Sequence, residues 1–235
     1  MLQNRATHHS KKNLVSVIIP TYNRCSLLKE AIYSVYSQTY RPIQCIIVDD
    51  GSADETFAFV NSILSLNNED FILQYLYQNN SGSQVARNAG TKVANGEYIQ
   101  YLDSDDLLYP TKLATQVSYL NDHPECDAVF GDWDSGTKSS NNLIVAYASK
   151  DMIKQFLTLE RNIANFSILM RRELVSHIGL WDVSIKRFQE IDFHLRGLMI
   201  GAIYHYQSLN TGLWRYHESP RIHNRAGLDA MCFFF

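Results

Sequence analysis

The sequence VSVIIPTYNR at residues 15–24 sets the pattern for the first half of the chain. Its start, residues 15–19, is a short run rich in β-branched apolar residues, which predicts a buried strand that Pro20 ends. From Ser26 onward, apolar residues recur at helical spacing, so we expect a helix with Ser26 as its N-cap and Pro42 beyond its end. A buried strand followed by such a helix is typical of a βαβ unit.

The same alternation of strands and helices continues to the middle of the chain. Further strands are predicted at residues 45–48, 71–77 and 98–102. Helices are predicted at residues 83–93 and 54–64, the latter with Phe57, Val60 and Leu64 inward. The alternation predicts an α/β fold class with a mostly parallel sheet flanked by helices. The second half is less regular, and we expect helices at residues 111–120, 151–159 and 189–198 and a short strand at 128–130.

Composition limits the class of protein. The chain has 235 residues, of which 46% are hydrophobic and 19% charged, which fits a soluble globular domain and excludes extensive disorder. The net charge of -3 gives no basic excess, so we expect no nucleic-acid partner. The 4 cysteines show neither CxxC pairs nor zinc spacing, and we expect reduced thiols in the cytoplasm.

The two ends of the sequence allow only coarse expectations. Residues 1–13 are polar and without the apolar segment of a signal peptide, so we expect a flexible N-terminal tail. No apolar run reaches the roughly 18 residues of a membrane span. The last residues, 231–235, read MCFFF. They leave open whether this end packs on the body, docks on the inner face of a membrane or marks a truncated chain.

Polar side chains gather where the predicted strands end. Residues 21–24 follow the first strand, 49–50 the second and 103–106 the fourth. In an open α/β sheet ligands bind beyond the carboxyl ends of the strands, so these loops predict a binding site at one edge of the sheet.

The acidic loop offers a specific chemistry. Asp103 and Asp105 are two carboxylates one residue apart, a pair that can hold Mg²⁺ together with the phosphates of a substrate. The alternative is that Asp105 or Asp106 caps the next helix, which is the commoner role of such a short motif. The same spacing recurs at residues 132–134, as Asp-Trp-Asp.

Other residues are ambiguous when taken singly. Tyr22 is either an ordinary exposed aromatic or a platform for a planar base, and Asp50 either a turn residue or an acceptor for a base N–H. Arg87 is either a surface charge or a ligand for phosphate. The sequence lacks GxGxxG, GxxxxGK[ST], HExxH and GxSxG motifs, which disfavours dehydrogenases, P-loop proteins, zincins and α/β-hydrolases.

Taken together and in order, these segments resemble family 2 glycosyltransferases. The resemblance covers about residues 14–220 and is carried by residues 15–24, 47–54, 86–90, 96–106, 171–172, 179–182 and 189–196. It implies a GT-A fold in a single domain at residues 14–235: a mixed, mostly parallel sheet with a Rossmann-like nucleotide-sugar-binding half at 14–110 and an acceptor and catalytic-base half at 111–235.

The resemblance also implies an activity. Members of the family transfer a sugar from a nucleotide diphosphate donor with inversion. For this chain it implies a UDP-sugar donor, a glycan or lipid-linked acceptor, and a place in surface polysaccharide or glycan biosynthesis. The protein would be cytoplasmic, with peripheral association at the inner face of the membrane left open. The sequence carries no prediction of the oligomeric state.

Matching the motifs position by position assigns roles to residues. Tyr22 would stack on the base and Asp50 would pair with it, while Thr21, Arg24 and Arg87 would line the donor pocket. The remaining matches concern the metal: Asp103 would face the ribose or donor sugar and the metal, Asp105 would bind Mn²⁺ or Mg²⁺, and His217 would approach the metal or diphosphate.

The expected catalytic base departs from the family pattern. The family usually has Glu-Asp at this place, and this chain has Gln189-Glu190. The base position matches Glu190, with Asp192 as a rival that more closely matches a structural position of the family. Glu190 lies about 100° from Ile191 on a helical wheel and can therefore face a cleft. Without the resemblance, a solvated Glu near a helix N-terminus is the preferred interpretation, and the match to the family reverses that preference.

Two other classes of protein stay open at this point. A haloacid dehalogenase-type phosphatase also has a DxD at a strand end, but on its first strand rather than its fourth. A non-catalytic module that binds nucleotide sugars is conceivable because Gln189 replaces an acid. Metal-dependent turnover of a nucleotide sugar would separate an enzyme from a binder.

Overall fold

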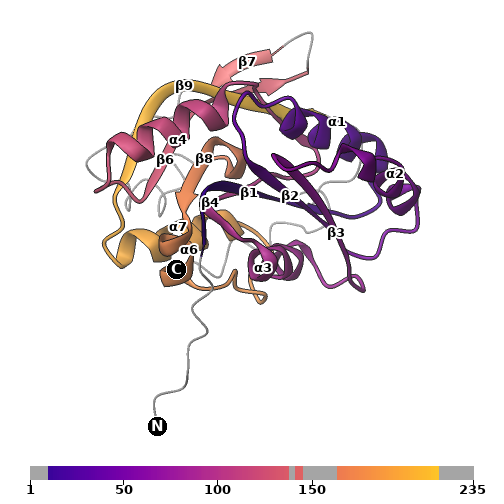
Figure 1. Ribbon diagram of the computed structural model, residues 1–235. Helices are drawn as coiled ribbons and strands as arrows, with labels where there is room; N and C mark the ends of the chain where they lie inside the picture. Colours follow the sequence, from indigo (N-terminus) through magenta and orange to yellow (C-terminus); the bar gives the residue numbers. More distant parts are fainter. Residues whose placement is uncertain (1–9, 138–140, 145–162, 217–235) are drawn as a thin grey trace.

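The structure is a computed structural model, and it describes residues 10–137, 141–144 and 163–216. Within them nine strands form one sheet, in the order β3-β2-β1-β4-β8-β6-β9-β5, with β7 paired to β6 (Figure 1). The strands are β1 Lys11–Thr21, β2 Ile43–Asp49, β3 Phe71–Tyr77, β4 Gly96–Tyr101, β5 Asp106–Leu108, β6 Ala128–Gly136, β7 Asn141–Ile144, β8 Ile168–Arg171 and β9 Tyr204–Arg215. The helices are α1 Cys25–Tyr36, α2 Thr56–Ser62, α3 Ser83–Val93, α4 Lys112–Asp122, α6 Arg172–Ile178 and α7 Gln189–Met199, with 3-10 turns η1 Leu64–Leu66 and η2 Asn165–Ser167.

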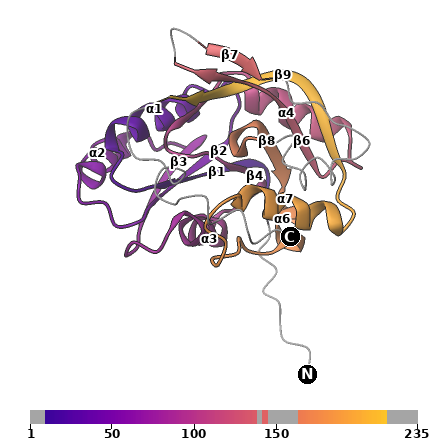
Figure 2. The ribbon, with the colours of Figure 1, turned by 180° about the vertical axis from the view of Figure 1, so that it is seen from behind.

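The first half is the predicted parallel sheet. Strands β3, β2, β1 and β4 run parallel, with Val15 opposite both Ile43 and Tyr98. All seven residues of β2 are buried because helices cover both faces of the sheet. Helices α1, α2 and α4 contribute to the core on one face, and α3, α6 and α7 to the core on the other (Figure 2).

The second half mixes strand directions. Strand β8 runs antiparallel to β4 and β6. Strand β9 runs parallel to β6, and its residues 212–214 also pair antiparallel with β5 on the other edge. Strands β5, β8 and β9 and helix α6 were not among the elements expected from the sequence. The reason is clearest for β9, whose sequence YHYQSLNTGLWR mixes polar and apolar residues without a regular period.

Several local expectations were wrong. Helix α1 begins at Cys25 rather than after a Ser26 cap, because the Cys25 N–H donates to Asp54 Oδ2 at 2.9 Å and fixes the first turn from outside. Helix α2 buries Val60 as expected, but Phe57, in its first turn, is 62% exposed. The helix ends at Ser62, and Leu64, in η1, is 40% exposed instead of inward. The alternative in which Asp105 or Asp106 caps the next helix was also wrong, as described below.

The boundaries of the chain differ from expectation at one end. Strand β1 begins at Lys11, so residues 11–13 belong to the sheet rather than to the expected tail. Residues 1–9 and the helix expected at 151–159 lie outside the described residues. Among the described residues, no helix is long and apolar enough to cross a membrane.

Close packing of α3 on the sheet gives a test of the fold. A Cβ at Gly90 would lie 2.5 Å from Ile18 Cγ2 and 3.2 Å from Val48 Cγ2. We expect Gly90→Val to lower the free energy of unfolding by about 2 kcal/mol or more, because both neighbours are β-branched and cannot turn away. Lys92→Val, at an exposed position of the same helix, is the control and should cost less than about 0.7 kcal/mol. Equal losses in urea unfolding would contradict this packing.

Candidate active site

The predicted polar loops meet at one edge of the sheet. Strands β1 and β2 are parallel and end together, with Thr21 opposite Asp49, and β4 ends beside them with Tyr101 opposite Ile18. Backbone bonds continue the alignment past the strand ends, since the Asp50 N–H donates to Thr21 O at 2.9 Å. The first three loops of the predicted site are therefore neighbours.

Asp50 organises the loop that leads into α3. Its carboxylate is 4% exposed and accepts three hydrogen bonds: Gln78 Nε2 at 2.7 Å and Ser81 N at 2.8 Å to Oδ1, and Gly82 N at 2.8 Å to Oδ2. An ionised carboxylate has about four lone-pair sites, so at most about one is left for a ligand. Asp49, for which no role was predicted, accepts from Tyr75 Oη at 2.6 Å.

The loop after β1 presents an aromatic ring. Tyr22 is 43% exposed, whereas Thr21 before it is 4% exposed and its Oγ1 has no hydrogen-bond partner among the described residues. Asn23 has a positive φ of 50° and bonds the second loop twice, through its N–H to Ser52 Oγ at 2.9 Å and through Oδ1 from Ala53 N at 2.8 Å. These bonds hold the Tyr22 loop in place.

Arg87 is a buried cation rather than a surface charge. It lies on α3 with 5% exposure, and its Nη2 donates to Asp103 Oδ1 at 2.5 Å. Its Nη1 donates to Gln189 Oε1 at 2.8 Å, and its guanidinium carbon lies 4.7 Å from the ring centroid of Trp181. The helix therefore points this guanidinium at the acidic loop.

The acidic loop separates its carboxylates by environment. Arg24 Nη1 donates to Asp105 Oδ2 at 2.6 Å, and the side chains of Asp103 and Asp105 stay 34% and 17% exposed. Asp106 is buried, which raises the pKa of its carboxyl well above its usual range, and the charges of Asp105 and Asp103 raise that pKa further. Asp106 begins strand β5, and the next helix begins at Lys112, so neither Asp105 nor Asp106 is the helix cap considered above.

Arg215, on β9, holds the main chain of this loop. It was not among the predicted site residues. Its Nε donates to Asp105 O at 2.5 Å, and its Nη2 donates to Ser104 O at 3.2 Å and to Leu27 O at 3.0 Å. Its Nη1 lies 3.2 Å from Glu30 Oε1. The sequence signal for Arg215 was its position two residues before His217, which the resemblance assigns to the metal or diphosphate. His217, expected near the metal, lies outside the described residues.

The expected base lies at the start of α7. Glu190 is half-buried in the first turn, directly after Gln189. The rival carboxylate, Asp192, accepts from Arg196 Nη2 at 2.9 Å one turn along the same helix. That ion pair fits a structural role for Asp192.

The donor set of the acidic loop suits a hard cation only in part. Asp103 and Asp105 supply the carboxylate oxygens that Mg²⁺ and Mn²⁺ accept, and each already pairs with an arginine. In the described part of the chain no group of three or more His, Cys, Asp or Glu side chains is placed to hold a metal ion. A cation here would need phosphate oxygens or water to complete its shell.

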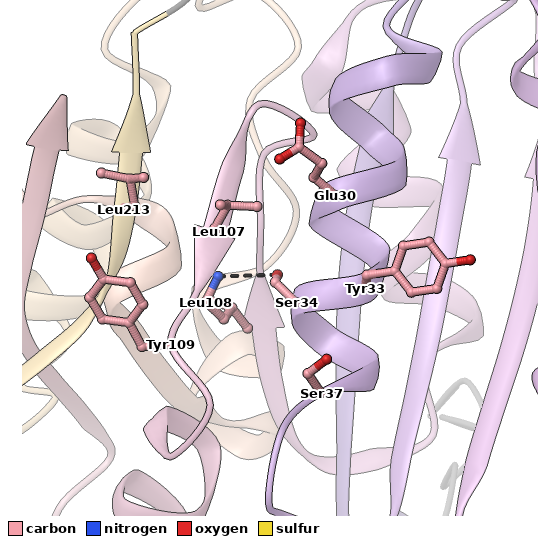
Figure 3. A pocket seen from close by; sticks show the side chains of 8 residues that line it. All are labelled: Glu30, Tyr33, Ser34, Ser37, Leu107, Leu108, Tyr109 and Leu213. Carbon is pink, nitrogen blue, oxygen red and sulfur yellow. Dashed lines mark hydrogen bonds between the residues drawn. The ribbon is translucent and has the colours of Figure 1, made fainter. Parts of the chain in front are cut away.

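A separate groove of about 510 Å³ lies between α1 and β5. Glu30, Tyr33, Ser34 and Ser37 line it from α1 and the residue after it, and Leu107, Leu108, Tyr109 and Leu213 from β5, the residue after it and β9 (Figure 3). None of the predicted site residues lines it. Glu30 connects this groove to the acidic loop through Arg215.

Comparison with known proteins now decides the family. The family model described as glycosyl transferase family 2 matches residues 16–179. The chain belongs to family 2 of the glycosyltransferases. An uncharacterized glycosyltransferase of Rickettsia typhi is 34% identical over 198 residues, 81% of this chain and 60% of the relative. A UDP-Glc:alpha-D-GlcNAc-diphosphoundecaprenol beta-1,3-glucosyltransferase of Escherichia coli is 37% identical over 107 residues, 46% of this chain and 41% of the relative.

Solved structures confirm the GT-A fold. S. aureus TarS 1-349 in complex with UDP-GlcNAc is similar with a TM-score of 0.71 at 19% identity, over 90% of this chain and 61% of that one. A mannosyltransferase from Pyrobaculum calidifontis in complex with GDP-Man and Mn²⁺ has a TM-score of 0.66 at 22% identity, over 87% and 57%. The chain thus spans less than two thirds of each of these relatives. Family membership overturns the phosphatase alternative.

The role of Arg215 can be tested against a matched arginine. Arg41 also donates to three carbonyl oxygens, those of Tyr36, Gln38 and Tyr40, but after α1 and outside the predicted loops. We expect Arg215→Met and Arg41→Met each to lower the free energy of unfolding by about 1–3 kcal/mol.

Only Arg215→Met should also weaken binding of UDP with Mn²⁺ in calorimetry, because only Arg215 holds the backbone of Asp105. If both variants bound UDP as the unmodified protein does, the loop would not depend on Arg215.

Proposed function

We propose that this family member transfers a sugar from a UDP-sugar to an acceptor hydroxyl, with inversion at the anomeric carbon and with Mn²⁺ or Mg²⁺ as cofactor. The observation that carries the proposal is the buried Arg87, which bridges Asp103 on the acidic loop and the first residue of the helix that bears Glu190. It joins the elements expected to hold the donor to the element expected to hold the base.

The donor would lie over the ends of β1, β2 and β4. Tyr22 would stack on the base, and the lone-pair site left on Asp50 would accept from a base N–H. Thr21, Arg24 and Arg87 would line the path to the diphosphate. A uridine donor is supported by the UDP-GlcNAc bound to TarS and by the donor in the name of the E. coli relative.

The cation would be held by Asp105 and Asp103 together with diphosphate oxygens. When bound, it would neutralise charge that develops on the leaving diphosphate. The Mn²⁺ present with GDP-Man in the archaeal mannosyltransferase supports this choice of metal. Because Arg24 pairs with Asp105, the carboxylate is already oriented at the loop tip.

The protein's own residues would supply the remaining catalysis. Glu190 would accept the proton of the acceptor hydroxyl while its oxygen attacks the anomeric carbon. The bond from that carbon to the diphosphate oxygen breaks in the same displacement, and Arg87 would stabilise the charge left on the diphosphate. A single displacement from the opposite face inverts the anomeric configuration.

The acceptor would be a glycan or lipid-linked sugar, bound by the half of the domain at 111–235. The diphosphoundecaprenol acceptor in the name of the E. coli relative supports a lipid-linked acceptor in surface polysaccharide or glycan synthesis. Such an acceptor would bring a cytoplasmic protein to the inner face of the membrane as a peripheral partner.

The test of the proposed function compares two acids of α7. Glu190→Gln keeps the shape of the base and removes its basicity, so we expect turnover to fall by about 10²–10⁴ with UDP affinity unchanged. Asp192→Asn breaks the ion pair with Arg196 and should lower thermal stability while transfer persists. Turnover is measured with a panel of nucleotide sugars, with Mn²⁺, and UDP affinity by calorimetry.

If transfer survived Glu190→Gln but was lost in a folded Asp192→Asn variant, Asp192 rather than Glu190 would be the base. A protein that binds UDP-sugars and never turns any over would be a binding module instead.

Metal dependence is tested at the acidic loop. Asp105→Ala should abolish the tightening of UDP binding by Mn²⁺, because it removes one of the two expected carboxylate ligands. Asp132→Ala, in the second Asp-x-Asp, is the control, since Asp132 instead accepts from Tyr206 Oη at 3.0 Å. Calorimetry with and without Mn²⁺ gives the comparison, and equal effects of Mn²⁺ on both variants would rule out Asp105 as a ligand.

A further inference from the structure

Gln189 stands where the family usually has an acid, and the structure gives it a defined partner. Gln189 is 8% exposed, and its Oε1 accepts from Arg87 Nη1 at 2.8 Å and from Ser83 Oγ at 3.2 Å. A guanidinium only donates, so the amide oxygen must face Arg87. The amide nitrogen donates to Lys186 O at 3.3 Å, which fixes the other end of the amide.

The neutrality of this partner sets the charge around Arg87. Besides the π-face of Trp181, the guanidinium contacts one carboxylate, Asp103, and two neutral groups, the Gln189 amide and, at 3.4 Å, the Ser83 hydroxyl. The positive charge of Arg87 is therefore matched by one negative charge, that of Asp103. A carboxylate at position 189 would place a second negative charge on the same guanidinium, in a buried setting where charge interactions are screened little.

The segment before α7 is fixed to α3 by other residues. Asn88 donates to Trp181 O at 2.9 Å and accepts from Trp181 N at 2.8 Å, and Gln84 donates to Ile185 O. These bonds do not involve Gln189. A change at Gln189 should therefore act on Arg87 without releasing the start of α7.

We propose that Gln189 is a positioning residue for the donor diphosphate: its neutral amide oxygen fixes Arg87 beside Asp103 and leaves the guanidinium charge available for phosphate. The inference rests on the proposed function, in which Arg87 lies on the path to the diphosphate. It adds to that function a residue that sets donor affinity through charge and takes no part in the chemical step.

The experiment measures binding of UDP and of uridine, which has the same base and no phosphates. Gln189→Glu should weaken UDP binding about tenfold, an effect of about 1.4 kcal/mol, and leave uridine binding unchanged. Gln189→Met removes the acceptor without adding charge and should weaken UDP binding less. In steady-state assays the donor KM of Gln189→Glu should rise while kcat stays within about twofold.

Two comparisons separate this role from a general effect. Met199→Glu adds the same charge at the far, 76% exposed end of α7 and should leave UDP affinity unchanged. In an Arg87→Met background, Gln189→Glu should have no further effect on UDP, because its partner is gone.

Unchanged UDP affinity in Gln189→Glu, an equal loss for uridine, or an undiminished effect without Arg87 would overturn the inference while the donor assignment stood. Failure of the unmodified protein to bind UDP would overturn the proposed donor and the inference with it.

Discussion

The buried guanidinium of Arg87 is the contact on which the arrangement of the site depends. It comes from α3, reaches Asp103 after β4 and meets Gln189 at the start of α7. The acidic loop and α7 are far apart in the sequence, and Arg87 bonds to both. Burial of an arginine is costly unless its donors are used. Both Nη atoms of Arg87 donate, to a carboxylate and an amide, and the face of Trp181 adds a cation–π contact, while its buried Nε has no partner among the described residues.

A second arginine supports the same loop from the other side. Arg215 bonds the backbone of Ser104 and Asp105, whereas Arg87 and Arg24 bond the carboxylates of Asp103 and Asp105. The loop is thus held through both its main chain and its side chains. Burial keeps Asp106 apart, since its raised pKa favours the neutral form, and this leaves two carboxylates to face a ligand.

The parallel first half of the fold was predictable because the spacing of its apolar residues matches the pattern of burial in its strands and helices. Strand β3 and helix α3 have the predicted bounds because an apolar run and a helical stripe mark them directly. Strand β9 was not predicted because its buried, half-buried and exposed residues follow no single period. Its C-terminal part pairs with β5 on one edge and with β6 on the other, so both edges of that part are satisfied by distant segments of the chain. The start of α1 was placed wrongly because its first N–H is satisfied by Asp54, about thirty residues further along the chain.

The part of the candidate site that lies in short sequence motifs was predictable. The loops that follow β1, β2 and β4 were expected to meet, and the strand register explains why they do. The roles of Asp49, Gln189 and Arg215 needed the structure, because each acts through a partner from another element. The ambiguity of Arg87 between surface charge and buried ligand also depended on tertiary contacts that no local pattern encodes.

A crystal structure of the protein with UDP and Mn²⁺ would test this account most directly. We expect the uracil to stack against Tyr22 and the cation to bind Asp105 and Asp103. A diphosphate oxygen should lie within hydrogen-bond distance of Arg87. Uridine diphosphate bound in the groove between α1 and β5, against Tyr33 and Tyr109, with the bond from Arg87 to Asp103 undisturbed, would contradict it.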